Sequence, residues 1–364
     1  MDIRTKLALA LVSVALVSMA ILGTFAYKTS AGLLKEISIR QLDALAESKK
    51  RDLIKVYEGW QDQIRLIRSR TQLRTSLRKY MESGDPEALG NINRIVEDAA
   101  TAVKNVEGIT VLDLEGKEIA SFGDATFVEG YNIPDDIDEV QYQGALLDEQ
   151  GVEVAFSTLL SLEGSPLGAM SVVIDASDLL SVTGNYTGLG ETGEAMVVMR
   201  TNDSSVMVLN PLRHQADETY DFDHSAEDVQ AVLEGREMVF TRNVEDYRGV
   251  NIWSATRFVP GLEWGLIVKI DADEEEKRAS ELRDALVDIS LALSAFAIIG
   301  GTLLGLYLAR PIHQLAETVE RMRKGETHLR ANTRGDDEIA YLAESLNELM
   351  DNLQSESDDK RPDA

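Results

Sequence analysis

The chain has 364 residues, enough for two or three domains, and its formal net charge of −27 repels nucleic acid and argues against a nucleic-acid partner. Residues 107–288 carry the whole imbalance, with 11 basic and 38 acidic side chains, which fits either a solvated acidic surface, as in a salty habitat, or a face that recruits cations. The absence of cysteine excludes disulfides, thiolate metal sites and cysteine nucleophiles.

Residues 7–26 are uncharged and predict a first transmembrane helix. At ~1.5 Å per residue, they would extend about 30 Å, the thickness of a bilayer core. The alternative is a cleaved signal peptide, but the apolar run exceeds the usual ~7–15 residues, and Thr24-Phe25-Ala26 is a poor cleavage site. We therefore expect an uncleaved anchor after a short cytoplasmic N-terminus at residues 1–6.

Helical spacing continues after the first span. From about Leu33 to Met81, apolar residues recur at steps of three and four, which predicts a long helix leaving the membrane. Gly84-Asp85-Pro86 interrupts this pattern, and residues 88–103 predict a second helix that packs on the first.

After Val106 the apolar pattern changes to that of strands, and the same succession of elements occurs twice. The first round predicts strands at residues 109–113, 117–121, 152–161 and 169–174, then a short helix at 175–182. The second round predicts a helix at 226–234 among strands at 195–200, 206–209, 236–245, 250–258 and 264–270. The predicted fold class is α+β, with two tandem modules that each have a curved antiparallel sheet and a core of their own.

Residues 289–309 predict the second transmembrane helix, which lies between Asp288 and Arg310. Cations cluster after this span and precede the first, so the positive-inside rule places both termini in the cytoplasm and residues 27–285 outside. The chain is thus expected to be a multi-pass protein of the cell (inner) membrane. Gly301 and Gly305 would let two helix backbones approach closely, and a contact between two copies is one use of such a face.

Two amphipathic helices are predicted after the second span. Their apolar positions follow heptad steps and are Ile312, Leu315, Val319 and Met322, then Ile339, Leu342, Leu346, Leu349 and Leu353. Such stripes form a parallel four-helix bundle only when two chains associate, so we expect a homodimer.

This segment resembles a HAMP domain over residues 310–355. The matching marks are Pro311 after the membrane, Gly325 after the first helix, and Asp337-Glu338 at the start of the second. The resemblance implies that Pro311, Gly325, Asp337 and Glu338 serve signal relay. Residues 356–364 predict a disordered tail, and no catalytic domain is recognised, so we expect a protein that is not an enzyme.

The outer region resembles the double Cache sensor family of bacterial transmembrane sensor histidine kinases and related receptors. The motifs that match are Tyr186–Glu194, Asn210–Arg213, Asp246–Gly249 and Trp264–Asp271. The resemblance implies two PAS-like modules, distal at about 107–182 and proximal at about 183–272. It also implies a small-molecule pocket, usually in the distal module.

The resemblance suggests two ligand-binding residues. In amino-acid-binding members an Asp after the last strand accepts the ligand ammonium, and Asp175 holds that position, although Asp is also a common helix N-cap. Tyr131 could line the pocket or be an ordinary packed tyrosine. Residues 130–150 contain no arginine to hold a ligand carboxylate.

The sequence indicates no metal, cofactor or catalytic residue. The acidic run 135–139 lacks the spacing and glycine of a calcium loop, and His214 and His224 are isolated. We therefore expect a bilayer-embedded receptor with an unidentified small-molecule ligand and a cytoplasmic kinase or other signalling protein as its partner. The alternatives are a sensory fragment of a longer histidine kinase or diguanylate cyclase, and a structural envelope protein that senses nothing.

Overall fold

The computed structural model describes residues 3–123, 134, 136–147, 151–201, 205–214, 226–242 and 244–359. The chain divides into two compact units. Leu34–Arg278 forms the outer α+β unit, whereas Met1–Leu33 and Ala279–Ala364 together form the second.

Helix α1 (Ile3–Arg68) is continuous from the first apolar span into the outer unit. The predicted helix to Met81 breaks earlier, because Arg70 is extended with φ −62° and ψ 106°, and α2 (Thr71–Ser83) follows. Gly84 ends α2 at φ +65°, and the Asp85 side chain then caps α3 (Pro86–Ala102) by accepting the Glu87 N–H at 3.0 Å.

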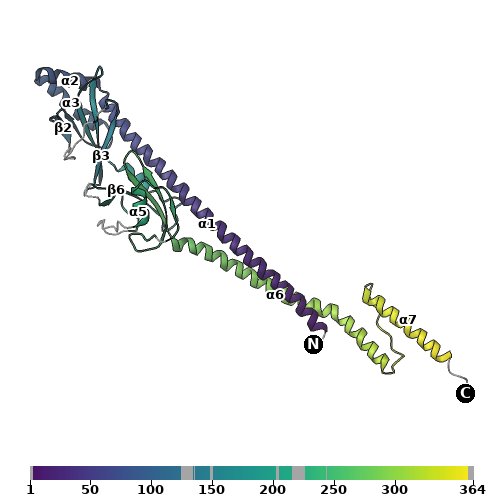
Figure 1. The fold of residues 1–364 in the computed structure, drawn as a ribbon. Helices are drawn as coiled ribbons and strands as arrows, with labels where there is room; N and C mark the ends of the chain where they lie inside the picture. The colour runs from purple at the N-terminus through teal and green to yellow at the C-terminus, as the bar shows by residue number, and fades with distance from the viewer. Residues whose placement is uncertain are drawn as a thin grey trace. The chain divides into compact units, whose positions relative to one another are not determined.

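Two sheets with the same strand order lie along α1 (Figure 1). The distal sheet has the order β2-β1-β5-β4-β3 and comprises β1 (Val106–Leu112), β2 (Glu118–Gly123), β3 (Val140–Leu147), β4 (Val152–Leu162) and β5 (Ser165–Asp175), with α4 (Asp178–Thr183) after it. The proximal sheet has the order β7-β6-β10-β9-β8 and comprises β6 (Glu194–Arg200), β7 (Val206–Val208), β8 (Val239–Phe240), β9 (Ile252–Val259) and β10 (Trp264–Asp271), with α5 (Glu227–Leu233) before β8. The predicted α+β class with tandem modules is confirmed.

Two strands differ from the prediction. β3 is absent from the prediction, because its apolar alternation lasts only to Gln143, is lost at Gly144 and Ala145–Leu147, and its register shifts between Tyr142 and Gly144. β8 comprises two residues where ten were predicted.

One apolar core joins the helices to both sheets. Leu53, Trp60 and Ile64 of α1 are at most 2% exposed. The Trp60 ring lies 6.2 Å from Phe156 of the distal sheet and 6.3 Å from Trp264 of the proximal sheet, between ring centroids. Aromatic packing around α1 therefore links the two modules.

The second unit contains the first part of α1, most of a long helix α6, and the helix α7. α6 (Ala272–Arg323) directly follows the last strand of the proximal sheet, and α7 (Glu338–Asp359) is the last described helix. By length and composition, α1 and α6 each contain a segment able to cross a membrane, and 0% and 6% of those segments are buried. Their apolar surfaces are thus free to face lipid.

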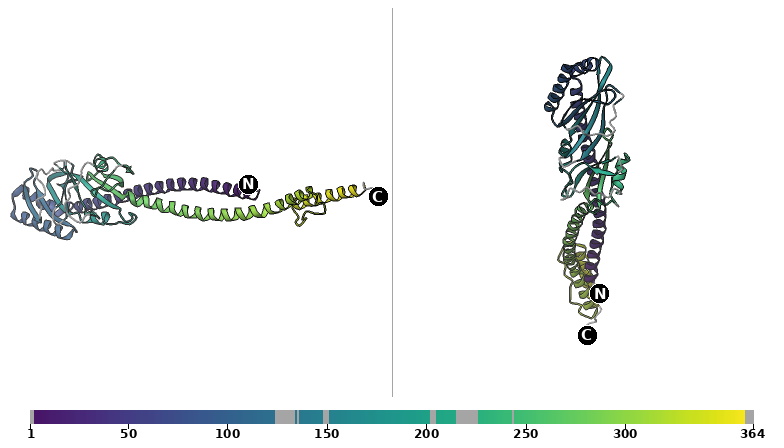
Figure 2. Two further views of the ribbon diagram at one scale, coloured as in Figure 1. Left: turned by 90° about the horizontal axis from the view of Figure 1, so that it is seen from below. Right: turned by 90° about the vertical axis from the view of Figure 1, so that its left-hand side faces the viewer.

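The two spans run side by side (Figure 2). A Cβ placed on Gly305 would lie 2.9 Å from the Ala8 Cβ, and one on Gly301 would lie 2.9 Å from Val12 Cγ2. These glycines therefore give room to the first span of the same chain.

Candidate functional site

A row of polar side chains crosses the distal sheet. Thr110 of β1 pairs with Ser121 of β2 and with Ser171 of β5. Ser171 pairs with Ser157 of β4, which pairs with Gln141 of β3. Directly paired residues point to the same face of a sheet, so these five residues, the polar row, share one face.

The polar row faces away from the helical core. The adjacent row on the opposite face, Ile109, Val172, Phe156 and Tyr142, packs with α1 and α3. The rows that flank the polar row on its own face are Gly108, Val173, Ala155 and Gly144 on one side and Leu112, Ala169 and Leu159 on the other. Glycine, alanine and larger aliphatic residues thus alternate around the polar row.

The three central residues of the polar row are buried, and one of their groups has no partner, whereas Ser121 is exposed and Gln141 is half-buried. Ser157 is 0% exposed, and Thr110 and Ser171 are each 8% exposed. Gln143 Nε2 donates to Ser157 Oγ at 2.6 Å, whereas Thr110 Oγ1 has no hydrogen-bond partner. An unpaired buried hydroxyl costs about 1–3 kcal/mol, which a polar ligand group bound here would recover.

Asp175 lies on the same face, at the end of β5. It pairs directly with Glu153 of β4 and is four residues beyond Ser171, or about 13 Å along the strand. Asp175 Oδ1 accepts the Ser177 N–H at 2.9 Å, so the carboxylate also shapes the turn into α4. Its predicted ligand role and its role in the turn are compatible. Tyr131 lies outside the described residues.

Four sequence motifs of the proximal module meet in a buried ion cluster. Lys269 Nζ lies 2.9 Å from Glu194 Oε1 and 2.7 Å from Asp246 Oδ2, and all three side chains are at most 2% exposed. Glu194 also accepts the Tyr247 hydroxyl at 2.9 Å and the Arg213 N–H at 2.8 Å. Burial alone would raise the pKa of Asp246, but Lys269 and Arg248 outweigh burial and hold it below its usual value. The motifs thus hold β6, β10 and the 246–249 turn together.

The loop before β6 binds the first turn of α6. Glu274 Oε2 accepts the Thr192 N–H at 2.9 Å and the Thr192 hydroxyl at 2.7 Å, and Glu274 Oε1 accepts the Glu191 N–H at 3.2 Å. Burial would raise the pKa of Glu274, but the bonds from Thr192 and Glu191 and the charge of Arg278 lower it overall. Gly190 has φ +69°, a conformation that L side chains rarely adopt, which explains the glycine.

The same loop region is fixed to α1. Lys49 is 7% exposed, and its Nζ donates to the carbonyl oxygens of Val182 at 2.7 Å and Asn185 at 2.8 Å. Gln41 Nε2 donates to the Gly188 carbonyl at 3.3 Å. Residues 182–194 therefore connect the distal module, α1 and the start of α6.

The predicted relay residues mostly mark helix ends in the second unit. Gly325 has φ +103° just after α6, where its N–H donates to the Met322 carbonyl at 3.0 Å. Asp337 Oδ1 accepts the Ala340 N–H at 2.9 Å and caps α7, whose first residue is Glu338. Pro311 instead lies inside α6, where it removes one helical hydrogen bond without ending the helix.

The C-terminal helices of a single chain leave apolar surface uncovered. Leu342, Leu349 and Leu353 of α7 are 57%, 56% and 53% exposed. A groove of about 760 Å³ lies between α6, the connector and α7. The connector is nevertheless held, because Asn347 accepts the Ala331 N–H at 2.7 Å and donates to the Ala331 carbonyl at 3.0 Å.

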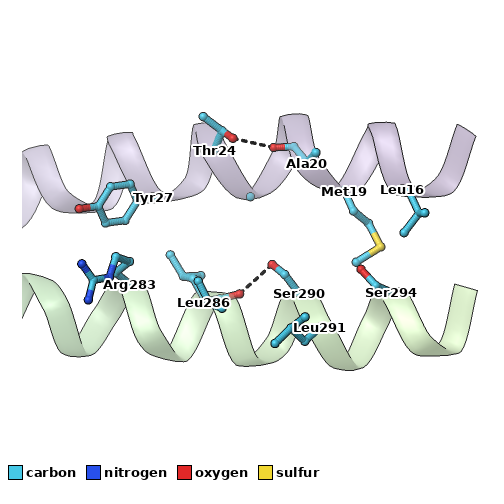
Figure 3. A pocket seen from close by; sticks show the side chains of 12 residues that line it. Leu16, Met19, Ala20, Thr24, Tyr27, Arg283, Leu286, Ser290, Leu291 and Ser294 are labelled. Atoms are coloured by element: carbon cyan, nitrogen blue, oxygen red, sulfur yellow. Dashed lines mark hydrogen bonds between the residues drawn. The ribbon is translucent and has the colours of Figure 1, made fainter. Parts of the chain in front are cut away.

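A cavity of about 470 Å³ lies between residues 16–27 of α1 and residues 283–294 of α6 (Figure 3). Its walls are mostly apolar, and Tyr27 and Arg283 lie at one end. Thr24 and Ser290 donate to carbonyl oxygens of their own helices, each at 2.7 Å. The cavity thus offers no free hydroxyl at these two positions.

Residues 303–355 match the HAMP domain family and form a HAMP domain. No protein with a curated description matches the chain. The ligand-binding domain of the Campylobacter jejuni chemoreceptor Tlp3, solved with L-norvaline, aligns at 15% identity and TM-score 0.44, covering 67% of this chain and 94% of that chain. That of the Pseudomonas fluorescens chemoreceptor CtaA, solved with L-leucine, aligns at 13% and 0.41, covering 67% and 99%. The extracellular domain of vpHK1S-Z8, described as a histidine kinase, aligns at 12% and 0.46, covering 67% and 98%.

Proposed function

We propose that this chain is a transmembrane signalling receptor that binds a small molecule outside the cell and relays the event through its HAMP domain. One observation carries the proposal. Helix α6 starts at Ala272, directly after the last strand of the outer unit, and continues to Arg323 inside the HAMP domain. A single helix thus belongs to both the outer unit and the relay.

The proposed mechanism has two states. A ligand that binds one arrangement of the outer unit better than the other shifts the population toward it, by tenfold for each ~1.4 kcal/mol of preference. The contacts of residues 182–194 with Lys49 and Glu274 would transfer the change to α6. A small shift of α6 would then repack the HAMP helices.

The active form is proposed to be a homodimer in the inner membrane, with both termini in the cytoplasm. The exposed leucines of α7 support this proposal, because they would otherwise face water. The output would go to a separate cytoplasmic kinase or other signalling protein.

Cysteine cross-linking tests the coupling between the outer unit and the HAMP domain and requires no known ligand. The chain has no cysteine of its own, so any disulfide forms at the introduced position. Leu349→Cys is introduced into the full chain in membrane vesicles, and the rate of disulfide formation between copies is measured. Glu274→Gln should change this rate, whereas Glu276→Gln, at an exposed position of the same helix, should not. Equal rates in all three backgrounds would contradict the relay and favour a structural envelope protein.

A further inference from the structure

A cavity of the outer unit lies beside α1, at the segment that joins the two modules. Its volume is about 490 Å³, within the range of about 300–1,000 Å³ that is typical of small-molecule sites. The walls come from residues 45–56 of α1, from the end of α4 and from residues 185–187. The cavity is therefore distinct from the polar row, and it has room for a small ligand.

Lys49 brings a buried positive charge to the wall of this cavity. Its ammonium has three N–H donors, and the two bonds to backbone carbonyl oxygens at 2.7 and 2.8 Å use two of them. Among the described residues no carboxylate forms an ion pair with Lys49, whereas the adjacent Lys50 pairs with Glu237 at 2.6 Å and Lys55 pairs with Asp52 at 3.0 Å. Burial lowers the pKa of Lys49, and the charge of Asp52 acts in the opposite direction without restoring it. The Lys49 ammonium thus lacks a counter-ion.

The residues around the cavity combine one excess positive charge with hydroxyl groups and an apolar wall. Lys49 and Lys55 supply two positive charges, and Asp52 supplies one negative charge. Ser48 and Thr187 contribute hydroxyls to the wall, and a hydroxyl can donate to a carboxylate oxygen. The apolar part of the wall consists of Leu45, Val56 and Val182. This lining matches a ligand with a single negative charge and a short hydrocarbon part.

We propose that this cavity binds a small aliphatic monocarboxylate, which pairs with the Lys49 ammonium and places its hydrocarbon part on the apolar wall. The carboxylate supplies the counter-ion that the buried ammonium lacks, through a charge-assisted hydrogen bond. A second carboxylate, or the ammonium of an amino acid, would add a charge without a partner. The inference goes beyond the proposed receptor function, because the site lies outside both sheets and its occupancy is measured without any signalling output.

Matched carboxylates and amides test the ligand class. The full chain in lipid nanodiscs is titrated by isothermal titration calorimetry with 4-methylpentanoate and 4-methylpentanamide, and with butanoate and butanamide. The two members of each pair have similar shapes and differ in charge. At least one carboxylate should bind at least about tenfold more tightly than its amide. Neither leucine, which adds an ammonium to the 4-methylpentanoate skeleton, nor chloride at equal concentration should displace the bound carboxylate.

Three variants test the site. Lys49→Met keeps most of the aliphatic side chain but removes the ammonium, and it should weaken carboxylate binding at least about tenfold. Asp52→Asn removes the negative charge beside the cavity and should tighten binding at least about threefold, which keeps the test decisive should Lys49→Met fold poorly. Lys50→Met is the control, because Lys50 pairs with Glu237 and does not line the cavity, and it should leave binding unchanged.

Amide hydrogen exchange locates the bound carboxylate. A ligand in this cavity should slow exchange in residues 181–187, because these residues form one of its walls. Three outcomes would overturn the inference: amides that bind as tightly as their carboxylates, binding that Lys49→Met and Asp52→Asn both leave unchanged, or no binding of either carboxylate. None of these outcomes bears on the cross-linking of Leu349→Cys, so the receptor function is tested separately.

Discussion

Replacing Lys269 with methionine should strongly destabilise the outer unit. The Lys269 ammonium is 2.9 Å from Glu194 and 2.7 Å from Asp246, and it lies 4.0 Å from the centre of the Tyr247 ring. Methionine has a similar volume but no charge, so Lys269→Met leaves two buried carboxylates without their shared cation. Breaking a buried ion pair in this way costs about 3–5 kcal/mol, a large part of a typical stability of about 5–15 kcal/mol.

Tryptophan fluorescence measures this loss in the full chain. All three tryptophans, Trp60, Trp253 and Trp264, lie within Leu34–Arg278, so the signal follows the outer unit alone. The control is Lys50→Met, because Lys50 and Glu237 pair at 2.6 Å but are 19% and 35% exposed. Such a partly exposed pair contributes about 1 kcal/mol or less.

The pH dependence supplies a second check. The pKa of Asp246 is lowered in the folded wild type, so its contribution to stability is present above the unfolded value of about 3.9 and is lost as pH falls through the folded value. In Lys269→Met, Asp246 keeps only Arg248 as a cationic partner, and protonation relieves its buried charge. The difference in unfolding free energy from wild type should therefore narrow as pH falls toward about 4. A loss no larger than that of Lys50→Met at pH 7, or a gap that widens on acidification, would refute the reasoning.

Three other predictions follow from contacts in each unit. Glu274→Gln should lower the stability of the outer unit by about 1.5–3 kcal/mol at pH 7 and speed amide exchange in residues 186–194. The difference in stability from wild type should shrink below about pH 4.3, because the pKa of Glu274 is lowered in the folded state. Glu276→Gln should change neither stability nor exchange. The double variant Ala8→Cys, Gly305→Cys should form a disulfide within one chain. The control Ala8→Cys, Gly300→Cys should not, since nothing lies within 4 Å of a Cβ at Gly300. Equal disulfide yields on non-reducing gels would contradict the packing of the two spans. Asn347→Leu should speed amide exchange at Ala331, because it removes the 2.7 Å hydrogen bond from the Ala331 N–H to Asn347. Glu348→Gln is the control, and equal exchange rates at Ala331 in the two variants would contradict the role of Asn347.

Features encoded by local patterns could be predicted from the sequence. The helical spacing around Trp60 and Ile64, the two uncharged spans, the interruption at Gly84-Asp85-Pro86 and the helix start at Asp337-Glu338 each depend on a few neighbouring residues. Their physical causes act within one or two helical turns, so they remain visible without a tertiary structure.

Features that depend on pairing distant segments could not be predicted in this way. The polar row needs the register of five strands, and no local pattern places Thr110 beside both Ser121 and Ser171. The ion cluster joins Lys269 to Glu194, 75 residues earlier in the chain, inside a strand whose apolar sequence gave no sign of a buried charge pair. The break at Arg70 carries neither glycine nor proline, so no local signal marks it in the sequence.

Because α6 is one continuous helix, the number of residues in it sets the direction in which its later side chains point. Its 52 residues would extend about 78 Å as one straight helix. One residue inserted between Arg278 and Ile289 would turn every later side chain by about 100° around the axis, whereas seven would restore the original orientation to within about 20°. Evolution or engineering could therefore reset the resting output of this receptor by altering the residue count there, with both the sensor and the bundle left untouched.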